Sequence, residues 1–77
     1  MTGIHTVKLQ KLRNFLKHYN FKEIRQKGSH LAFTKEGLER PIIIAVRGKE
    51  VQFYVCKQII RILEITEENF LKELKKY

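Results

Sequence analysis

Residues 25 to 30, Arg25-Gln26-Lys27-Gly28-Ser29-His30, combine side chains that could do chemistry within six positions. A histidine can carry a proton near neutral pH, and cationic side chains hold phosphate groups through charge-assisted hydrogen bonds. A Gly-Ser step lets the backbone come close to a ligand. The run therefore predicts a surface site for a phosphate-containing ligand, with His30 as the proton carrier.

Simpler explanations exist for both polar side chains at the end of this run. A lone histidine in a strand is more often structural than catalytic. Ser29 is badly placed to be a nucleophile activated by His30, because neighbouring residues of an extended chain point to opposite sides. We expect Ser29 to be a turn residue or a backbone contact to phosphate.

The two other histidines lack such a setting. His5 falls in an expected flexible tail over residues 1–5, and His18 lies near a helix end, where a protonated ring interacts favourably with the terminal carbonyls. They are not spaced as a metal pair, and no carboxylate cluster accompanies them. We expect no metal and no cofactor.

Positive charge is concentrated in the first third of the chain. The 77 residues have a formal net charge of +8, and residues 8–27 hold seven Lys or Arg against one Glu. Such a field attracts polyanions, either nucleic acid or an acidic protein, and weakens as salt rises. The alternative is that these lysines only keep a small protein in solution.

Hydrophobic spacing predicts a helix over residues 6–19, ended by Asn20, which tolerates a left-handed backbone. Residues 21–27 and 30–35 then alternate with a period of two and meet at Gly28-Ser29, as two antiparallel strands would. Successive strand residues point to opposite faces. If Leu31 and Phe33 face the core, His30 must therefore point to the solvent-facing side of the sheet.

The second half of the sequence predicts further strands and helices. Residues 40–47 contain a buried third strand, and residues 51–55 indicate a short fourth strand or extended stretch before a helix from about residue 55. Thr66 is placed to cap a last helix. The sequence thus predicts an α+β fold with three or four antiparallel strands, one sheet face covered by helices and the other open.

Length and composition limit the remaining possibilities. We expect one domain over residues 1–77, with a core too small for an enclosed cofactor pocket. Cys56 is the only cysteine, so no internal disulfide is possible, and its apolar neighbours indicate a core residue. No stretch approaches the roughly 18 apolar residues of a membrane span, and residues 1–12 lack the apolar segment of a signal peptide. We expect a soluble, cytoplasmic protein without a membrane partner.

The run from Arg25 to His30, preceded by Asn20-Phe21 and followed by Leu31-Ala32-Phe33, closely resembles the HicA family of toxins, small ribonucleases of type II toxin-antitoxin modules. The resemblance extends to Thr66-Glu67-Glu68, and its specific motif lies in residues 21–33. It implies a fold similar to the double-stranded RNA-binding domain (dsRBD), in the order α-β-β-β-(β)-α-(α). Where members commonly have Pro-x-His after the third strand, this chain has Ile44-Ala45-Val46.

The resemblance implies a metal-independent RNA endonuclease (mRNA interferase) in which His30 is the catalytic residue. It also implies an acidic HicB-like antitoxin as a partner. The expected RNA contacts are Arg25, Lys27, Gly28 and Ser29 beside the histidine, and Lys8, Lys11 and Lys17 for the flanking RNA.

Two other functions stay open at this stage. One is a non-catalytic RNA-binding module, although dsRBDs usually place a lysine cluster at the start of their last helix, where this chain has only Lys57 and Arg61. The other is an inactive HicA-like interaction module whose basic face meets an acidic protein.

Overall fold

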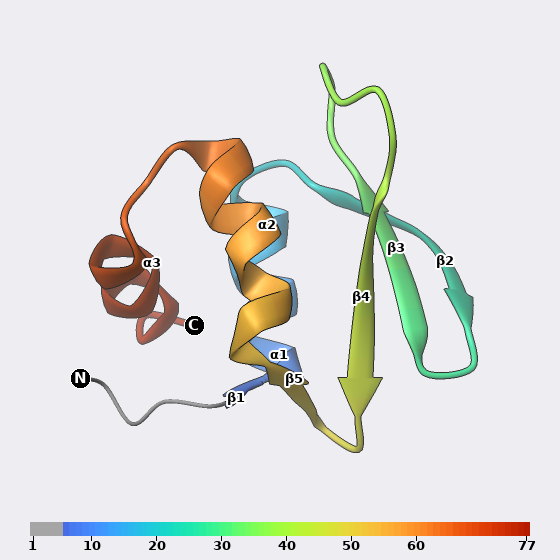
Figure 1. Ribbon diagram of the computed structural model, residues 1–77, viewed down its shortest axis with the longest axis horizontal. Helices are drawn as coiled ribbons and strands as arrows, with labels where there is room; N and C mark the ends of the chain where they lie inside the picture. Colours follow the sequence, from blue (N-terminus) through green and yellow to red (C-terminus); the bar gives the residue numbers. More distant parts are fainter. Residues whose placement is uncertain (1–5) are drawn as a thin grey trace.

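The computed structural model describes residues 6–77 as a five-stranded antiparallel sheet with three helices (Figure 1). The elements in chain order are β1 (Thr6–Lys8), α1 (Leu9–His18), β2 (Lys22–Lys27), β3 (His30–Thr34), β4 (Ile42–Arg47), β5 (Glu50–Gln52), α2 (Phe53–Leu63) and α3 (Glu67–Leu74). The strand order is β1-β5-β4-β3-β2. The predicted α+β class with an antiparallel sheet is confirmed, whereas the expected tail lies outside the described residues.

Alternation along the central strands divides the sheet into two faces. In β3, Leu31 and Phe33 are buried while His30 is exposed, and in β4, Ile42 and Ile44 are buried while Ile43 is 48% exposed. Since successive strand residues point to opposite sides, the buried set lines the core and His30 shares the other face with Ile43. We call this other face the open face.

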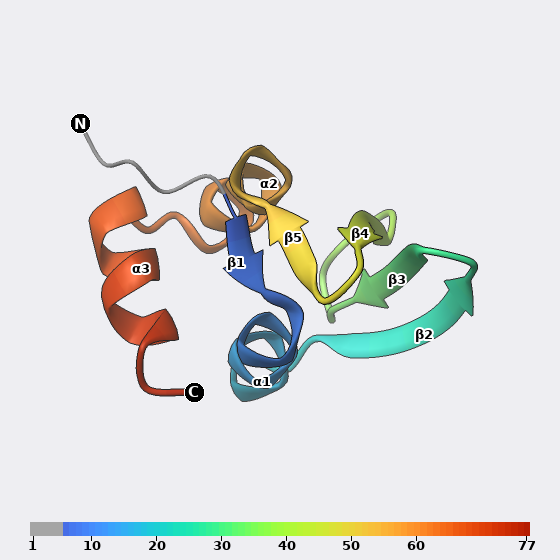
Figure 2. The ribbon, with the colours of Figure 1, turned by 90° about the horizontal axis from the view of Figure 1, so that it is seen from below.

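Helices cover only the core-lining face. The apolar stripe of α1, which includes Leu12, Phe15 and Leu16, is fully buried, and Cys56 and Ile59 of α2 join the same cluster. Figure 2 shows α1 and α2 on the side of β4 and β3 where α3 also lies, with α3 outside both. Burial of these side chains supplies most of the stability of so small a domain, and it leaves the open face without a helix over it.

The last helix begins as predicted. Thr66 has extended backbone angles, and its hydroxyl accepts a hydrogen bond of 3.0 Å from the backbone N–H of Asn69. This bond satisfies one of the donors that every helix leaves unpaired at its start. None of the helices within residues 6–77 has the length and apolar character that crossing a membrane requires.

Two helix boundaries differ from those predicted. Thr6–Lys8 forms β1 and not the first turn of the first helix, because these residues pair with β5 in the register Thr6 with Gln52, Val7 with Val51 and Lys8 with Glu50. The strand β5 ends at Gln52, so α2 begins at Phe53 and not near residue 55. At β1 a pairing distant in sequence overrides the local helical pattern, whereas at residues 53–55 the helix replaces the alternating stretch that predicted a strand.

Candidate functional site

The two-residue turn Gly28-Ser29 joins β2 to β3 and positions the histidine. Lys27 and His30 are direct cross-strand partners, and Gly28 has a positive φ of 59°. Glycine at the first central position is typical of a type II′ hairpin turn, whose twist matches that of the strands. The backbone N–H of Val46 donates a hydrogen bond of 2.8 Å to the carbonyl of Ser29, which extends the β3–β4 pairing past His30.

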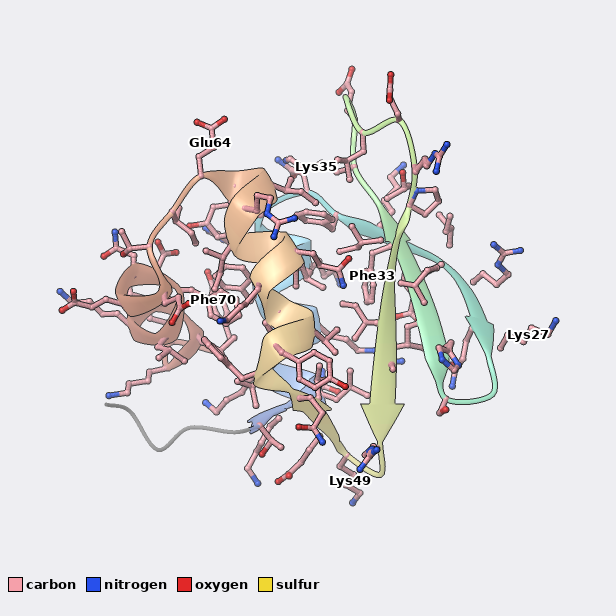
Figure 3. The ribbon with its side chains drawn as sticks, viewed as in Figure 1. Lys27, Phe33, Lys35, Lys49, Glu64 and Phe70 are labelled. Carbon is pink, nitrogen blue, oxygen red and sulfur yellow. The ribbon has the colours of Figure 1, made fainter. Side chains whose placement is uncertain are left out.

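Three of the predicted site residues meet on the open face. Lys27 lies directly opposite His30, and side chains so paired have Cβ atoms about 5 Å apart. Arg25 lies opposite Ala32, one diagonal step away. All three line one shallow hollow, to which Leu31, Ala32 and Ile43 also contribute. Figure 3 shows Lys27 extending outward from β2 into solvent.

Small residues surround the imidazole on its other side. Ala45 of β4 is the direct partner of His30, and Ala32 lies two positions along β3 on the same face. Ala45 is exposed and its short methyl group does not cover His30, whereas Ala32 is only 3% exposed and is covered by neighbouring side chains. Among residues 6–77 no side-chain hydrogen bond or ion pair holds the imidazole, so both ring nitrogens are free to contact a ligand.

The predicted lysines of the first third separate in space. Lys8 pairs with Glu50, so by register it belongs to the same sheet face as His30. Lys11 and Lys17 lie on α1, which covers the opposite face. The ammonium of Lys11 donates a hydrogen bond of 3.0 Å to the carbonyl of Tyr77, so this lysine also holds the end of the chain. The basic first third is therefore not one continuous surface.

Sequence reasoning missed other cations that the fold brings to the open face. Arg47 follows Ala45 by two residues in β4, which places it diagonally beside His30. A second hollow, next to the first, is lined in part by Tyr54 and Arg61 of α2. Alternation along β4 could have identified Arg47, but no local pattern predicts that one side of α2 lies beside this face.

The remaining chemically active groups have structural surroundings. Cys56 is completely buried, as predicted, and the resulting loss of hydration raises the pKa of its thiol to about 12. The ring of His18 contacts the rings of Tyr19 and Tyr77, with centroids 5.2 and 5.6 Å away. Within the described part of the chain no three His, Cys, Asp or Glu side chains gather as metal ligands would.

Comparison with known proteins adds one finding to this geometry. A family model described as "HicA toxin of bacterial toxin-antitoxin" matches residues 10–65, which is most of the chain and includes the whole of the β2–β3 hairpin. A comparison with curated proteins and one with solved structures found no significant match.

Proposed function

The chain belongs to the HicA toxin family, and on this premise we propose that it is a metal-independent RNA endonuclease whose one catalytic side chain is His30. Membership makes it a toxin of a bacterial toxin-antitoxin module. The observation that supports the catalytic role is the exposure of His30 on the open face, directly opposite Lys27 and one step from Arg25. A polynucleotide backbone can reach this imidazole without any rearrangement of the protein.

RNA carries its own nucleophile, the 2′-hydroxyl, so the protein has to orient the strand, move protons and stabilise charge. The 2′-oxygen attacks the adjacent phosphorus and the bond from phosphorus to the 5′-oxygen breaks. One proton leaves the 2′-hydroxyl and one is delivered to the 5′-oxygen. The products are a 2′,3′-cyclic phosphate and a 5′-hydroxyl. His30 either accepts the first proton or donates the second.

Lys27 and Arg25 bind the reacting phosphate. Their positive charge counters the extra negative charge that the pentavalent phosphate develops, an interaction stronger in the transition state than in the ground state. Gly28 and Ser29 line a separate hollow with Gln26 and Val46, so a contact of their backbone to the RNA would lie at the tip of the hairpin, where Gly28 has no side chain to prevent close approach. Lys8, and more remotely Lys11 and Lys17, contact flanking RNA.

Digestion of single-stranded RNA by the purified protein tests this function. We expect cleavage that persists in excess chelator and yields 2′,3′-cyclic phosphate ends. The His30→Ala protein should lose about 10²- to 10⁴-fold in rate, the usual contribution of a general acid or base, while circular dichroism and RNA affinity stay close to wild type. Undiminished cleavage by His30→Ala would remove the mechanism.

Family membership also implies a cognate antitoxin of the HicB type. We propose that this partner is acidic and that it covers the open face, since a net charge of +8 attracts an acidic protein. Co-expression with the product of the adjacent gene, followed by size-exclusion chromatography, tests the complex. Failure of the two proteins to co-elute at low salt would contradict this assignment.

A further inference from the structure

A second hollow continues the site across the open face. The first hollow holds His30, Arg25 and Lys27, and the second is bordered by Ala45 of β4 and by Tyr54 and Arg61 of α2. Ile43 lines both hollows, so they meet at this one side chain. Together they form a shallow trough from the β2–β3 hairpin to α2. Figure 1 shows α2 lying beside β4.

The position of α2 follows from the shortness of β5. Only Val46 and Arg47 of β4 pair with β5. The earlier residues of β4 therefore have no strand beside them on the side that faces away from β3. The side-chain amide of Gln58 fills this role by donating hydrogen bonds of 3.0 Å to the carbonyls of Ile43 and Val55. The bond to Ile43 fastens α2 along β4, whereas the bond to Val55 lies within α2 itself. The exposed side of the helix therefore adjoins the open face.

The chemistry of the second hollow fits single-stranded nucleic acid. Tyr54 is 70% exposed, a high value for an aromatic side chain, and an exposed aromatic ring can stack on any base. Arg61 supplies a cation seven residues further along the same side of the helix. Lys57 is 3.7 Å from the carboxylate of Glu67 and so has an anionic partner already. Within residues 6–77 no Asp or Glu lines either hollow.

We propose that the RNA strand crosses the open face from His30 over Ile43 to α2, where one base stacks on Tyr54 and Arg61 binds a backbone phosphate. This inference rests on the proposed endonuclease function and names the residues that hold the flanking RNA. Neighbouring strands are about 4.8 Å apart, so the trough spans a few nucleotides. The path differs from one over α1, whose Lys11 and Lys17 lie on the opposite side of the sheet.

Binding of a 5′-labelled single-stranded RNA of about 12 nucleotides, measured by fluorescence anisotropy in the His30→Ala background, tests the path. Tyr54→Ala should weaken binding by about tenfold, and Tyr54→Phe should restore it because the ring is kept. Arg61→Ala should weaken binding and reduce the slope of log K against log salt by about 0.7, the value for one lost phosphate contact on a single strand. Tyr54→Ala should leave that slope unchanged.

Lys72→Ala is the matched control, since Lys72 is an exposed cation on α3, away from the sheet. It should bind as the parent does, and circular dichroism should show all variants folded. Wild-type affinity for RNA in both Tyr54→Ala and Arg61→Ala would overturn the path. The path would also be overturned if these two variants lost binding of the antitoxin while keeping their affinity for RNA, because the region would then be a protein interface. An equal loss in Lys72→Ala would also overturn it, because it would indicate unspecific attraction. Absence of RNA cleavage by the protein with His30 intact would instead be a failure of the proposed function.

Discussion

The hairpin β2–β3 and the hairpin β4–β5 are built on the same two-residue turn. Gly28-Ser29 joins the pair Lys27 and His30, and Gly48-Lys49 joins the pair Arg47 and Glu50. The two glycines have positive φ values of 59° and 61°, and a cation precedes each of them. In both hairpins the first residue after the turn is exposed.

The two hairpins differ in how their outer strands are paired. The outer strand β5 is paired with β1, and the carboxylate of Glu50 accepts a hydrogen bond of 3.0 Å from the hydroxyl of Thr6. The outer strand β2 is a sheet edge whose six residues are all exposed, with a bulge between Glu23 and Arg25. Bulges and charges on an edge strand discourage pairing with another chain. Both turns are exposed, so the two hairpins differ in their outer strands: β5 is paired on both sides, whereas β2 is paired only with β3.

The largest difference between the hairpins is expected from replacing the residue after each turn with glutamine. His30→Gln removes the proton carrier, so the rate of RNA cleavage should fall by about 10²- to 10⁴-fold. Glu50→Gln keeps an oxygen for the Thr6 hydroxyl, so its cleavage rate should stay within about threefold of wild type. Single-turnover cleavage of a labelled RNA measures both. Equal losses in the two variants would place the chemistry elsewhere.

The cations of the two hairpins should differ in RNA affinity. Lys27→Ala removes a phosphate contact of the kind worth about 1.5–3 kcal/mol, so RNA should bind roughly 10- to 100-fold more weakly and with a shallower salt dependence. Lys49, in the second turn, does not line either hollow, and Lys49→Ala should change the affinity by less than about twofold. Titrations at several salt concentrations check the pair. A steeper loss in Lys49→Ala than in Lys27→Ala would contradict the assignment of the first hairpin to RNA.

The two turns should respond alike in stability. No atom lies within 4 Å of where a Cβ on Gly28 or Gly48 would stand, so alanine costs only the strain of a positive φ, about 1–2 kcal/mol. Urea denaturation should give similar losses in the free energy of unfolding for Gly28→Ala and Gly48→Ala. Only Gly28→Ala should also slow cleavage, because it shifts His30 relative to Lys27. Equal slowing by Gly48→Ala would show that general instability, and not local geometry, controls the rate.

The smallest effect is expected from Ser29→Ala. The contact that Ser29 makes to β4 uses its backbone carbonyl, which alanine keeps, and its hydroxyl is not the nucleophile in the proposed mechanism. The free energy of unfolding should change by less than about 0.5 kcal/mol and the cleavage rate by less than about threefold. A loss of 10²-fold or more, measured in the same cleavage assay, would show that the Ser29 hydroxyl takes part in catalysis.

Much of the candidate site could be predicted from short stretches of sequence. The period of two in residues 30–35 predicts that His30 lies on the sheet face away from Leu31 and Phe33, and the Gly-Ser step predicts the turn. Thr66 was identified as a helix cap for an equally local reason, the position of its hydroxyl before a helical pattern. Each of these predictions depends on residues within a few positions of one another, where backbone geometry alone decides which side chains share a face.

Other parts of the site could not be predicted in this way. The concentration of positive charge in residues 8–27 predicts one cationic surface, but α1 carries Lys11 and Lys17 to the face opposite His30. Conversely, the side of α2 that bears Tyr54 and Arg61 joins the open face through the bond from Gln58 to Ile43, a contact across 15 positions. Charge counted along the chain therefore predicts the sign of a partner's charge but not where the cations lie in the fold.

The chain by itself determined the hairpin, the outward direction of His30 and the apolar stripes of the helices, because these follow from periodicity and from the conformations open to glycine. Only the tertiary structure decided that Thr6–Lys8 is a strand, that α2 begins at Phe53, and which cations surround the histidine. The reason is physical. Pairing between β1 and β5 joins residues more than 40 positions apart, and the stabilisation it provides exists only once the core has brought them together.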